Sequence, residues 1–271
     1  MARLSVITRQ NVYRDRRVQG REWKNVYGGY FSDERVINSF LRACEPLVEK
    51  LPREPSILYV CSGTGLLGER LCAFLRKRGF APRLTLVDSS EKQLRQNMNP
   101  RTEKIVGDLL RLRLGGRKFD LIIMRSSLDY FYSPSLQRRA LKRVASLLKL
   151  GGVFVNQCCC FPTLKERALA CRMRLLSSKI GRRLFHWPPE LPLLYRAAGF
   201  EELRKIGEAP PLRLTEKDHV ARYGVTREEI AKIRCLIRRV SKGRFRNVRV
   251  TQSGYETLEY FPIYAACLKP H

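Results

Sequence analysis

Three glycines and one aspartate are the residues whose spacing most clearly suggests a ligand. Residues 63–68 read Gly-Thr-Gly-Leu-Leu-Gly, a G-x-G-x-x-G turn, and Asp88 follows Gly68 by 20 residues. Glycine lets the backbone approach a ligand closely, because it has no Cβ and tolerates positive φ. A carboxylate at that spacing can accept hydrogen bonds from both hydroxyls of a ribose. The pattern is typical of NAD sites and equally of sites for adenosyl cofactors.

The chain around this turn predicts alternating strands and helices. Short apolar runs predict buried strands at residues 56–60, 83–88, 103–108, 119–124 and 153–158. Helical patterns separate them, and one opens at Ser133 and Pro134, where a cap residue followed by proline is the expected helix start. This alternation favours an α/β fold with a doubly wound parallel sheet, which binds ligands at the carboxyl ends of its strands.

The pattern changes after residue 160. The elements expected there are helices at 163–180, 188–200 and 226–242 and strands at 201–208 and 257–268. We predict a basic segment at 1–31, followed by a single domain over 32–271. The domain is expected to carry helical insertions at about 161–187 and 209–250, which form a lid over the sheet.

The order of these segments resembles that of the class I S-adenosylmethionine (SAM)-dependent methyltransferases over roughly residues 30–268. The stretch "ILYVCSGTGLLGERL" is similar to their first motif, "LTLVDSSEKQL" to their ribose-binding strand end and "IVGDLLRL" to their adenine-side turn. The stretches "FDLIIMRSSLDYF" and "LLKLGGVFVNQ" are similar to their fourth and fifth strands. The resemblance implies a seven-stranded, Rossmann-like, mostly parallel sheet with an antiparallel last strand. It also implies SAM as cofactor and S-adenosylhomocysteine (SAH) as its product.

The resemblance carries cofactor roles to particular residues. In that family the glycine turn cradles the methionine part of SAM, the acid after the second strand binds the ribose, and the acid after the third strand contacts the adenine. The cofactor-binding residues implied in this way are Tyr59, Cys61, Gly63, Gly65, Asp88, Ser89, Asp108, Leu109 and Arg125. The two acids also have a purely structural interpretation, since each could cap the segment that follows it.

Two residues depart from the family's pattern. Tyr59 stands where the family usually has an acid that helps hold the amino group of methionine, and Cys61 stands where it has the first glycine. Asp129 or a residue of the N-terminal segment could supply the missing contact. The methionine end of the cofactor is therefore the part of the site that the resemblance describes least well.

Two residues are candidates for catalysis. Asp129 follows the fourth strand and could orient the substrate, and His219, between the sixth and last strands, could act as a general base. A helix-preceding cap and a surface histidine are the respective alternatives. The run 158–160 is three cysteines, which we interpret as small core residues. No zinc-type spacing accompanies them, so no metal site is expected.

The formal net charge is +28, from 53 basic and 25 acidic residues. Such a charge favours nucleic acid, an anionic membrane surface or acidic substrates as partners, although 38 of the basic residues are arginine, which composition bias also explains. Apolar stretches fall short of the roughly 20 residues that span a bilayer, so no transmembrane segment is expected. The nine cysteines have no disulfide-like spacing, and we expect a cytoplasmic protein.

Several functions remain open after the cofactor is assigned. The favoured one is methyl transfer from SAM to an O, N or C acceptor on a small molecule. The alternative is methyl transfer to RNA or at an anionic membrane surface, through the basic helices at 163–180 and 226–242. An inactive SAM-fold binding protein is less favoured, and so is an NAD-binding oxidoreductase, because NAD explains only the first two motifs. The sequence assigns no oligomeric state.

Overall fold

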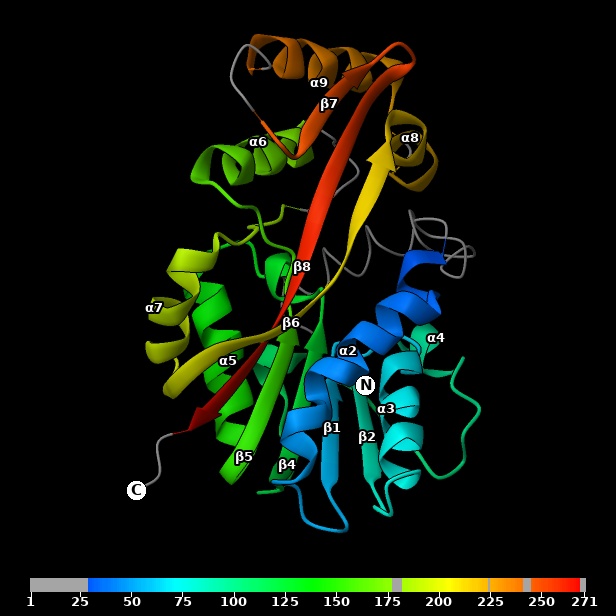
Figure 1. The fold of residues 1–271 in the computed structure, drawn as a ribbon, viewed down its shortest axis with the longest axis vertical. Coiled ribbons are helices and arrows are strands. Elements are labelled where there is room, and N and C mark those ends of the chain that lie inside the picture. Colours follow the sequence, from blue (N-terminus) through cyan, green and yellow to red (C-terminus); the bar gives the residue numbers. More distant parts are fainter. Residues whose placement is uncertain (1–28, 177–181, 224, 241–244, 269–271) are drawn as a thin grey trace.

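The computed structural model describes residues 29–176, 182–223, 225–240 and 245–268. In these ranges eight strands form one sheet, with helices on both of its faces (Figure 1). The strands are β1 (Ser56–Val60), β2 (Arg83–Asp88), β3 (Glu103–Val106), β4 (Phe119–Arg125), β5 (Leu148–Gln157), β6 (Phe200–Thr215), β7 (Val248–Thr251) and β8 (Gly254–Leu268). The α-helices are α2 (Glu34–Val48), α3 (Leu66–Arg76), α4 (Glu91–Leu94), α5 (Pro134–Leu147), α6 (Leu164–Leu175), α7 (Leu191–Arg196), α8 (Glu216–Tyr223) and α9 (Arg227–Val240).

The strand order is β3-β2-β1-β4-β5-β8-β6, with β7 paired to β8. Strands β1 to β5 run parallel, whereas β8 is antiparallel to both β5 and β6. The parallel strands β1, β2 and β4 are mostly buried because helices cover both faces, which is why β1 reads as a continuous apolar run, whereas the edge strand β3 is largely exposed. The predicted fold class is thereby confirmed, including the mostly parallel sheet and the antiparallel last strand.

Strand β6 is longer than the sequence predicts. It continues to Thr215, seven residues beyond the predicted end, so the helical part of the later insertion begins only at Glu216. Prolines occupy positions 210–211 of this strand, and proline cannot donate to the ladder. A register shift between Ala209 and Leu212 leaves both prolines out of the pairing with β8, and the strand continues past them.

The sheet has eight strands in the described ranges, one more than the seven predicted, and the additional strand is β7. It lies within the segment at 209–250 that was expected to be helical. Val248 and its neighbours pair antiparallel with the start of β8 across a tight turn between Thr251 and Gly254. The backbone of Gly254 has φ +139°, a conformation that favours glycine, and the resulting hairpin explains the strand.

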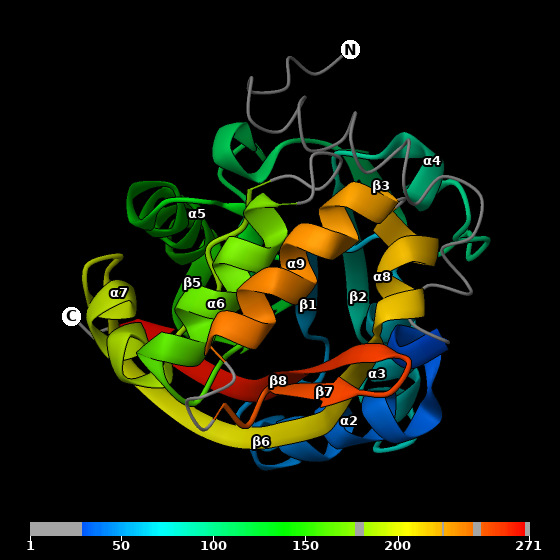
Figure 2. The same cartoon turned by 90° about the horizontal axis from the view of Figure 1, so that it is seen from above.

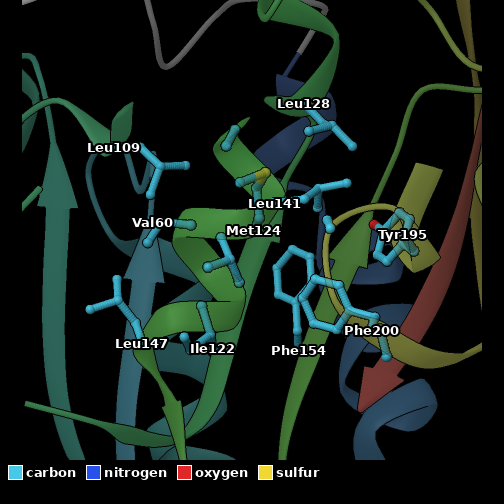
Figure 3. Close-up of a cluster of buried hydrophobic side chains, with 14 of the residues drawn as sticks. Val60, Leu109, Ile122, Met124, Leu128, Leu141, Leu147, Phe154, Tyr195 and Phe200 are labelled. Atoms are coloured by element: carbon cyan, nitrogen blue, oxygen red, sulfur yellow. The ribbon is translucent and has the colours of Figure 1, made fainter. Parts of the chain in front are cut away.

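Two apolar clusters hold the sheet between its helical layers. In β4, Ile122 and Met124 pack on the side of α5 (Figure 3), and Leu121 and Ile123 pack on the side of α2 and α3. Successive side chains point to opposite faces of a strand, so each cluster draws on alternate residues. Because both faces are packed, the carboxyl ends of the strands have defined positions.

Strands β6 and β8 extend past the carboxyl ends of the other strands (Figure 1). The outer halves of β6 and β8 form an upper lobe together with β7, α6, α8 and α9. In the view from above, α6 and α9 lie over the sheet (Figure 2). This lobe has an apolar cluster of its own, whose members include Leu169 and Met173 of α6 and Ile233 and Ile237 of α9. The lobe occupies the place expected of a lid, while the assignment of residues 32–271 to one domain stays a prediction.

The helices of the described ranges are short. The longest, α2, has 15 residues, whereas about 20 are needed to cross a bilayer. None of them combines the length and the apolar character of a membrane span.

Candidate functional site

The turn between β1 and α3 needs glycine at two positions for different reasons. Gly65 has φ +79°, and a Cβ there would lie 2.3 Å from Cδ1 of Leu86 in the core. Gly63 has φ +57°, and a Cβ there would meet no atom within 4 Å. Gly65 is therefore required by packing, whereas Gly63 borders open space where a ligand can approach the backbone. Cys61 also has positive φ, at +52°, which turns the chain out of β1.

This difference predicts separable effects of two alanine substitutions. Gly65→Ala is expected to lower the free energy of unfolding by about 2–3 kcal/mol, because positive φ and overpacking against Leu86 both oppose the added methyl group. Gly63→Ala meets only the backbone cost, about 1–2 kcal/mol, and is expected to weaken cofactor binding more than Gly65→Ala does at equal folded fraction. Thermal unfolding and calorimetric titration measure the two effects. Equal loss of stability in both variants would contradict the assignment.

Asp88, at the end of β2, joins the turn to the start of α4. Its Oδ2 accepts a hydrogen bond from the Gly63 amide at 2.7 Å, and its Oδ1 accepts one from the Ser90 amide at 2.8 Å. Burial raises the pKa of Asp88, and the backbone amides of Ser90, Gly63 and Ser89 oppose that rise. A carboxylate offers about four lone-pair positions, so acceptor capacity remains for ribose hydroxyls. We propose that Asp88 and Ser89 bind the ribose of the cofactor.

Asp108 lies two residues after the end of β3, at the same edge of the sheet as Asp88. It is buried, and its Oδ1 accepts a hydrogen bond from the Leu110 amide at 3.0 Å, so it caps a short 3₁₀ helix. Leu109 is buried in the cluster on the α5 side. Burial raises the pKa of the Cys61 thiol, and the charges of Asp88 and Asp108 raise it further. Both carboxylates therefore act on the same turn, and we propose Asp108 and Leu109 for the adenine side.

Tyr59 and Arg125 face each other on the α3 side of the sheet. Burial raises the pKa of the Tyr59 hydroxyl, and the guanidinium of Arg125, which hydrogen-bonds it, opposes the rise. The Tyr59 ring packs against α3, since a Cβ at Gly68 would lie 3.1 Å from it. Gly68 therefore serves helix–strand packing. The position usually occupied by an acid carries instead a phenol bound to an arginine from the neighbouring strand.

Sequence reasoning missed three polar residues at the same edge. Ser62 and Ser126 follow the ends of β1 and β4, Gln157 is the last residue of β5, and the side chains of all three contain buried polar atoms without a hydrogen-bond partner in the described structure. Burial of a polar group without a hydrogen bond is costly, so such atoms indicate places where a ligand completes the bonding. A glutamine at the end of an otherwise apolar strand, "VFVNQ", was the available signal for Gln157.

Asp129 is engaged in an ion pair. Its carboxylate lies 3.1 Å from Nη1 of Arg183, with both side chains almost fully buried. Its backbone carbonyl accepts a hydrogen bond from the Leu184 amide, and the Leu184 carbonyl accepts one from Gln137 of α5. Burial raises the pKa of Asp129, and the charge of Arg183 opposes the rise. The geometry favours Asp129 as an anchor for the chain around residue 184, and a catalytic role stays a prediction.

His219 lies away from the strand ends. It is on helix α8 and buried, with Nε2 3.3 Å from Oγ1 of Thr257, so the alternative of a surface loop histidine is wrong. Thr257 stands six residues along β8 from Ile263, which pairs with Gln157. Six residues of strand correspond to roughly 20 Å. A position inside the upper lobe does not support His219 as the base, because a general base must reach the proton it removes.

The cysteine run after β5 is part of the core. Cys158, Cys159 and Cys160 are all buried, and the thiol of Cys159 lies 3.8 Å from the carboxylate of Glu259. Burial raises the pKa of Cys159 and of Cys160 well above the ordinary value. They therefore stay protonated thiols at neutral pH. Within the described ranges, His, Cys, Asp and Glu side chains form no group that could hold a metal ion.

His186, beside this run, predicts a pH dependence of stability. Burial, together with the smaller effect of the Arg167 charge, lowers the pKa of His186 from 6.5 to about 3. The folded protein keeps the ring neutral while the unfolded chain binds a proton below pH 6.5, so stability falls as the pH drops below that value. The free energy of unfolding between pH 7 and pH 4 is expected to fall less steeply in His186→Gln than in the wild type. Identical slopes for the two proteins would contradict this.

The Gly63 turn, the two strand-end acids and the orphaned polar atoms lie along one edge of a doubly wound sheet. This arrangement defines a Rossmann-like protein that binds a nucleotide-like cofactor at the carboxyl ends of its strands. The open space at Gly63, the free acceptor capacity of Asp88 and the unpaired buried atoms fit such a ligand.

Comparison with known proteins agrees with this arrangement. Residues 57–152 match the family model described as "Methyltransferase domain". No curated protein sequence matches the chain. A putative methyltransferase from Bacillus halodurans has a similar structure, with a TM-score of 0.66, 16% identity and coverage of 84% of this chain and 99% of that one. The YcgJ protein from Bacillus subtilis is similar with a TM-score of 0.65, 14% identity and the same coverages, 84% and 99%.

A third solved structure holds ligands. It is phosphoethanolamine N-methyltransferase 2 from Haemonchus contortus, solved with phosphomonomethylethanolamine and SAH. Its TM-score is 0.53 at 15% identity, and the match covers 97% of this chain and 60% of that one. At these identities the solved structures show only that the fold is shared. The activity, methyl transfer, is indicated by the family model that matches residues 57–152. Residues 57–152 therefore form a methyltransferase domain, in a chain with the fold of the class I SAM-dependent methyltransferases, and the cofactor is SAM.

Proposed function

We propose that the methyl acceptor is a small molecule. The observation that carries this is the burial of the strand ends beneath the upper lobe. Gln157 is 0% exposed, and Nη1 of Arg125 and Oγ of Ser126 are buried as well. A polymer chain would have to reach the same edge of the sheet through this cover, whereas a small acceptor fits within it. Ligand sites that enclose their ligand are typical of small molecules.

An aromatic group adjoins these strand ends. The rings of Tyr30 and Phe31 pack on Phe261 with centroid distances of 5.5 and 5.9 Å, and the Tyr30 hydroxyl donates to the Pro210 carbonyl. Phe161 and Phe185 belong to the same cluster. Apolar walls exclude water, and they suit methyl transfer, which is an in-line displacement that depends on holding donor and acceptor collinear in a dry site.

The positions of the two catalytic candidates favour an acceptor that needs little help from a base. Asp129 is held by Arg183, and His219 lies in the upper lobe. SAM supplies an electrophilic methyl group, and a neutral amine attacks it without prior loss of a proton. The small phosphorylated amine named for the Haemonchus contortus protein is an acceptor of this kind. A small amine is therefore our first choice of acceptor.

A methyl-label assay tests this proposal. The protein is incubated with methyl-labelled SAM and, separately, with a panel of small amines and phenols, with total RNA and with vesicles containing anionic lipid. Label in the amine panel, accompanied by SAH formation, is the expected result. Label confined to RNA or to lipid would contradict the proposal. SAM binding with no SAH formed from any acceptor class would point to a binding protein.

One feature favours the alternative of an RNA or membrane substrate. Helices α8 and α9 border an open groove of about 910 Å³, whose lining includes Arg227, Arg239 and the apolar side chains of Val220 and Val225. Arginines are prominent in the lining of this groove, although one of them, Arg234, is already paired with Glu216. A surface of this kind attracts polyanions through charge.

Salt dependence separates this alternative from the main proposal. If RNA docks at the groove, the double substitution Arg227→Ala and Arg239→Ala is expected to weaken RNA binding and to reduce its salt slope by about 2, one for each lost phosphate contact. Binding to RNA and to anionic vesicles is measured between low and moderate salt. Salt-insensitive transfer to a small amine, unchanged by the double substitution, would exclude the alternative.

A further inference from the structure

Arg125, at the end of β4, is a half-buried cation that has no counter-ion within the described ranges. In the part of the chain that the structure describes, it takes part in no ion pair, and its Nη1 is buried without a hydrogen-bond partner. Its neighbours are the ring of Phe31, 5.3 Å from the guanidinium carbon, and the hydroxyl of Tyr59. The side chain as a whole is half-buried, but a buried guanidinium nitrogen without a hydrogen-bond partner is costly, so Nη1 in this position indicates an anionic ligand group.

Gln157 stands directly beside Arg125 in the sheet. The two residues are Cα partners in the ladder between β4 and β5. Gln157 is completely buried, and neither its Nε2 nor its Oε1 has a hydrogen-bond partner in the described ranges. Next to both, Ser126 donates its backbone amide to the Gln157 carbonyl, while its own buried hydroxyl has no partner. The pair therefore offers unused donors from both residues and an unused acceptor from the amide.

These side chains share one face of the sheet with Tyr59. Tyr59, Ile123 and Val155 all belong to the cluster on the α2 and α3 side. Arg125 and Gln157 follow Ile123 and Val155 by two residues each, and residues two apart in a strand point to the same face. The three polar residues thus form a row across β1, β4 and β5, at the edge that carries the Gly63 turn.

We propose that Arg125 and Gln157 bind the amino-acid end of SAM. Its carboxylate accepts hydrogen bonds from the Arg125 guanidinium and the Gln157 amide, and its ammonium donates to the amide oxygen of Gln157. The pair replaces the acid that the resembling family has where this chain has Tyr59. Tyr59 is a positioning residue, because its hydroxyl holds Arg125 and its ring packs against α3. The proposal rests on SAM as the cofactor and adds which residues bind one end of it.

Binding of two nucleosides that differ only in this end tests the proposal. SAH has the amino-acid end, and 5′-methylthioadenosine has the same thioether nucleoside without it. Calorimetric titration of the wild type is expected to show SAH binding at least about 10-fold more tightly. Arg125→Met and Gln157→Leu are each expected to weaken SAH on the order of 10- to 100-fold, since each removes a hydrogen bond to a charged group. Their affinity for 5′-methylthioadenosine is expected to stay within about 2-fold of the wild type, so both variants lose the preference for SAH.

Tyr59→Phe is the matched control for positioning. It keeps the ring against Gly68 and removes the hydroxyl, so a smaller loss of SAH affinity is expected, again without a change for 5′-methylthioadenosine. Arg125→Lys keeps the charge and is expected to recover part of the SAH affinity lost in Arg125→Met. A structural role alone would lower the affinity for both nucleosides together with the melting temperature.

Failure of the proposed Arg125 and Gln157 contacts can be distinguished from failure of SAM as the cofactor. Equal affinities of the wild type for SAH and 5′-methylthioadenosine would overturn the proposal without any variant, and so would an unchanged preference for SAH in Gln157→Leu. If a variant fails to fold, the decarboxylated analogue of SAH on the wild type tests the carboxylate directly, and binding as tight as that of SAH would also overturn it. Failure of the wild type to bind either nucleoside would instead contradict the assignment of SAM as cofactor.

Discussion

Asp88→Asn is expected to lower the affinity for SAM on the order of 100-fold or more and to leave most of the fold intact. The carboxylate is expected to bind both ribose hydroxyls through charge-assisted hydrogen bonds, each worth about 1.5–3 kcal/mol. The asparagine oxygen can still accept from the Gly63 amide, whereas its NH₂ group cannot accept from the Ser90 amide. A stability loss of about 1–2 kcal/mol is therefore expected alongside the loss of binding.

Calorimetry with SAM, SAH and NAD on the wild type and on this variant measures the effect. Asp120→Asn is the matched control, because Asp120 lies near the amino end of β4, where it accepts hydrogen bonds from Ser56 and pairs with Lys149 at 2.8 Å. It is expected to leave SAM affinity unchanged. Unaltered SAM binding in Asp88→Asn would contradict the assignment of Asp88 to the ribose. Binding of NAD but not of SAM to the wild type would contradict the choice of cofactor.

Arg183→Met is expected to destabilise the protein by about 3–5 kcal/mol at pH 8, the range for removing one partner of a buried ion pair. The substitution leaves the carboxylate of Asp129 buried without the guanidinium that lies 3.1 Å from it. Methionine keeps much of the apolar stem of arginine, so the charge accounts for most of the loss.

The loss depends on pH with a defined sign. Burial raises the pKa of Asp129 in the folded protein above its ordinary 3.8, and Arg183 is a main group opposing the rise. In the variant the folded state therefore holds its proton more tightly than the unfolded chain, so stability falls as the pH rises above 3.8. Chemical unfolding is expected to show a smaller loss at pH 5 than at pH 8. The double variant with Asp129→Asn is expected to remove this pH dependence, and a pH-independent loss in Arg183→Met alone would contradict the argument.

The glycine turn and the first strand-end acid were predictable because their signal is local. A strand, a turn that needs positive φ and a helix must follow one another within about a dozen residues, and the types at Gly63, Gly65 and Gly68 record that requirement. The helices at α6 and α9 were predictable for the same reason, since their capping boxes at Thr163 and Thr226 bond residues only three apart.

The partners of Arg125 were not predictable in this way. Arg125 was placed in the site by its position after the fourth strand, but its contacts depend on the register of β4 against β5 and on the packing of Phe31. Gln157 lies 32 residues further along the chain, and no local pattern relates the two. Asp129 and Arg183 are 54 residues apart in the chain, so no local pattern predicted their ion pair either.

In the upper lobe, pairing between distant segments decided both the length of β6 and the position of His219. The sequence predicts that the sixth strand ends at residue 208, yet β6 continues to Thr215, because β8 supplies a pairing partner on either side of the register shift at the prolines 210–211. The same long β8 pairs with β7 and holds Thr257 beside His219 inside the lobe. A candidate base on a lid was thus placed away from the strand ends by pairing between distant segments.

The sequence by itself determined the α/β fold, the direction of the glycine turn and the presence of an acid at the end of β2, because short-range sterics and apolar periodicity suffice for these features. Only the tertiary structure decided which polar side chains meet at the carboxyl edge. The tertiary structure places Arg125 beside Gln157 and pairs Asp129 with Arg183. It places His219 beside Thr257 in the upper lobe, away from the strand ends. The physical reason is that strand register and buried charge pairing are satisfied between residues far apart in the chain, and the side chains near any one position carry no record of those distant partners.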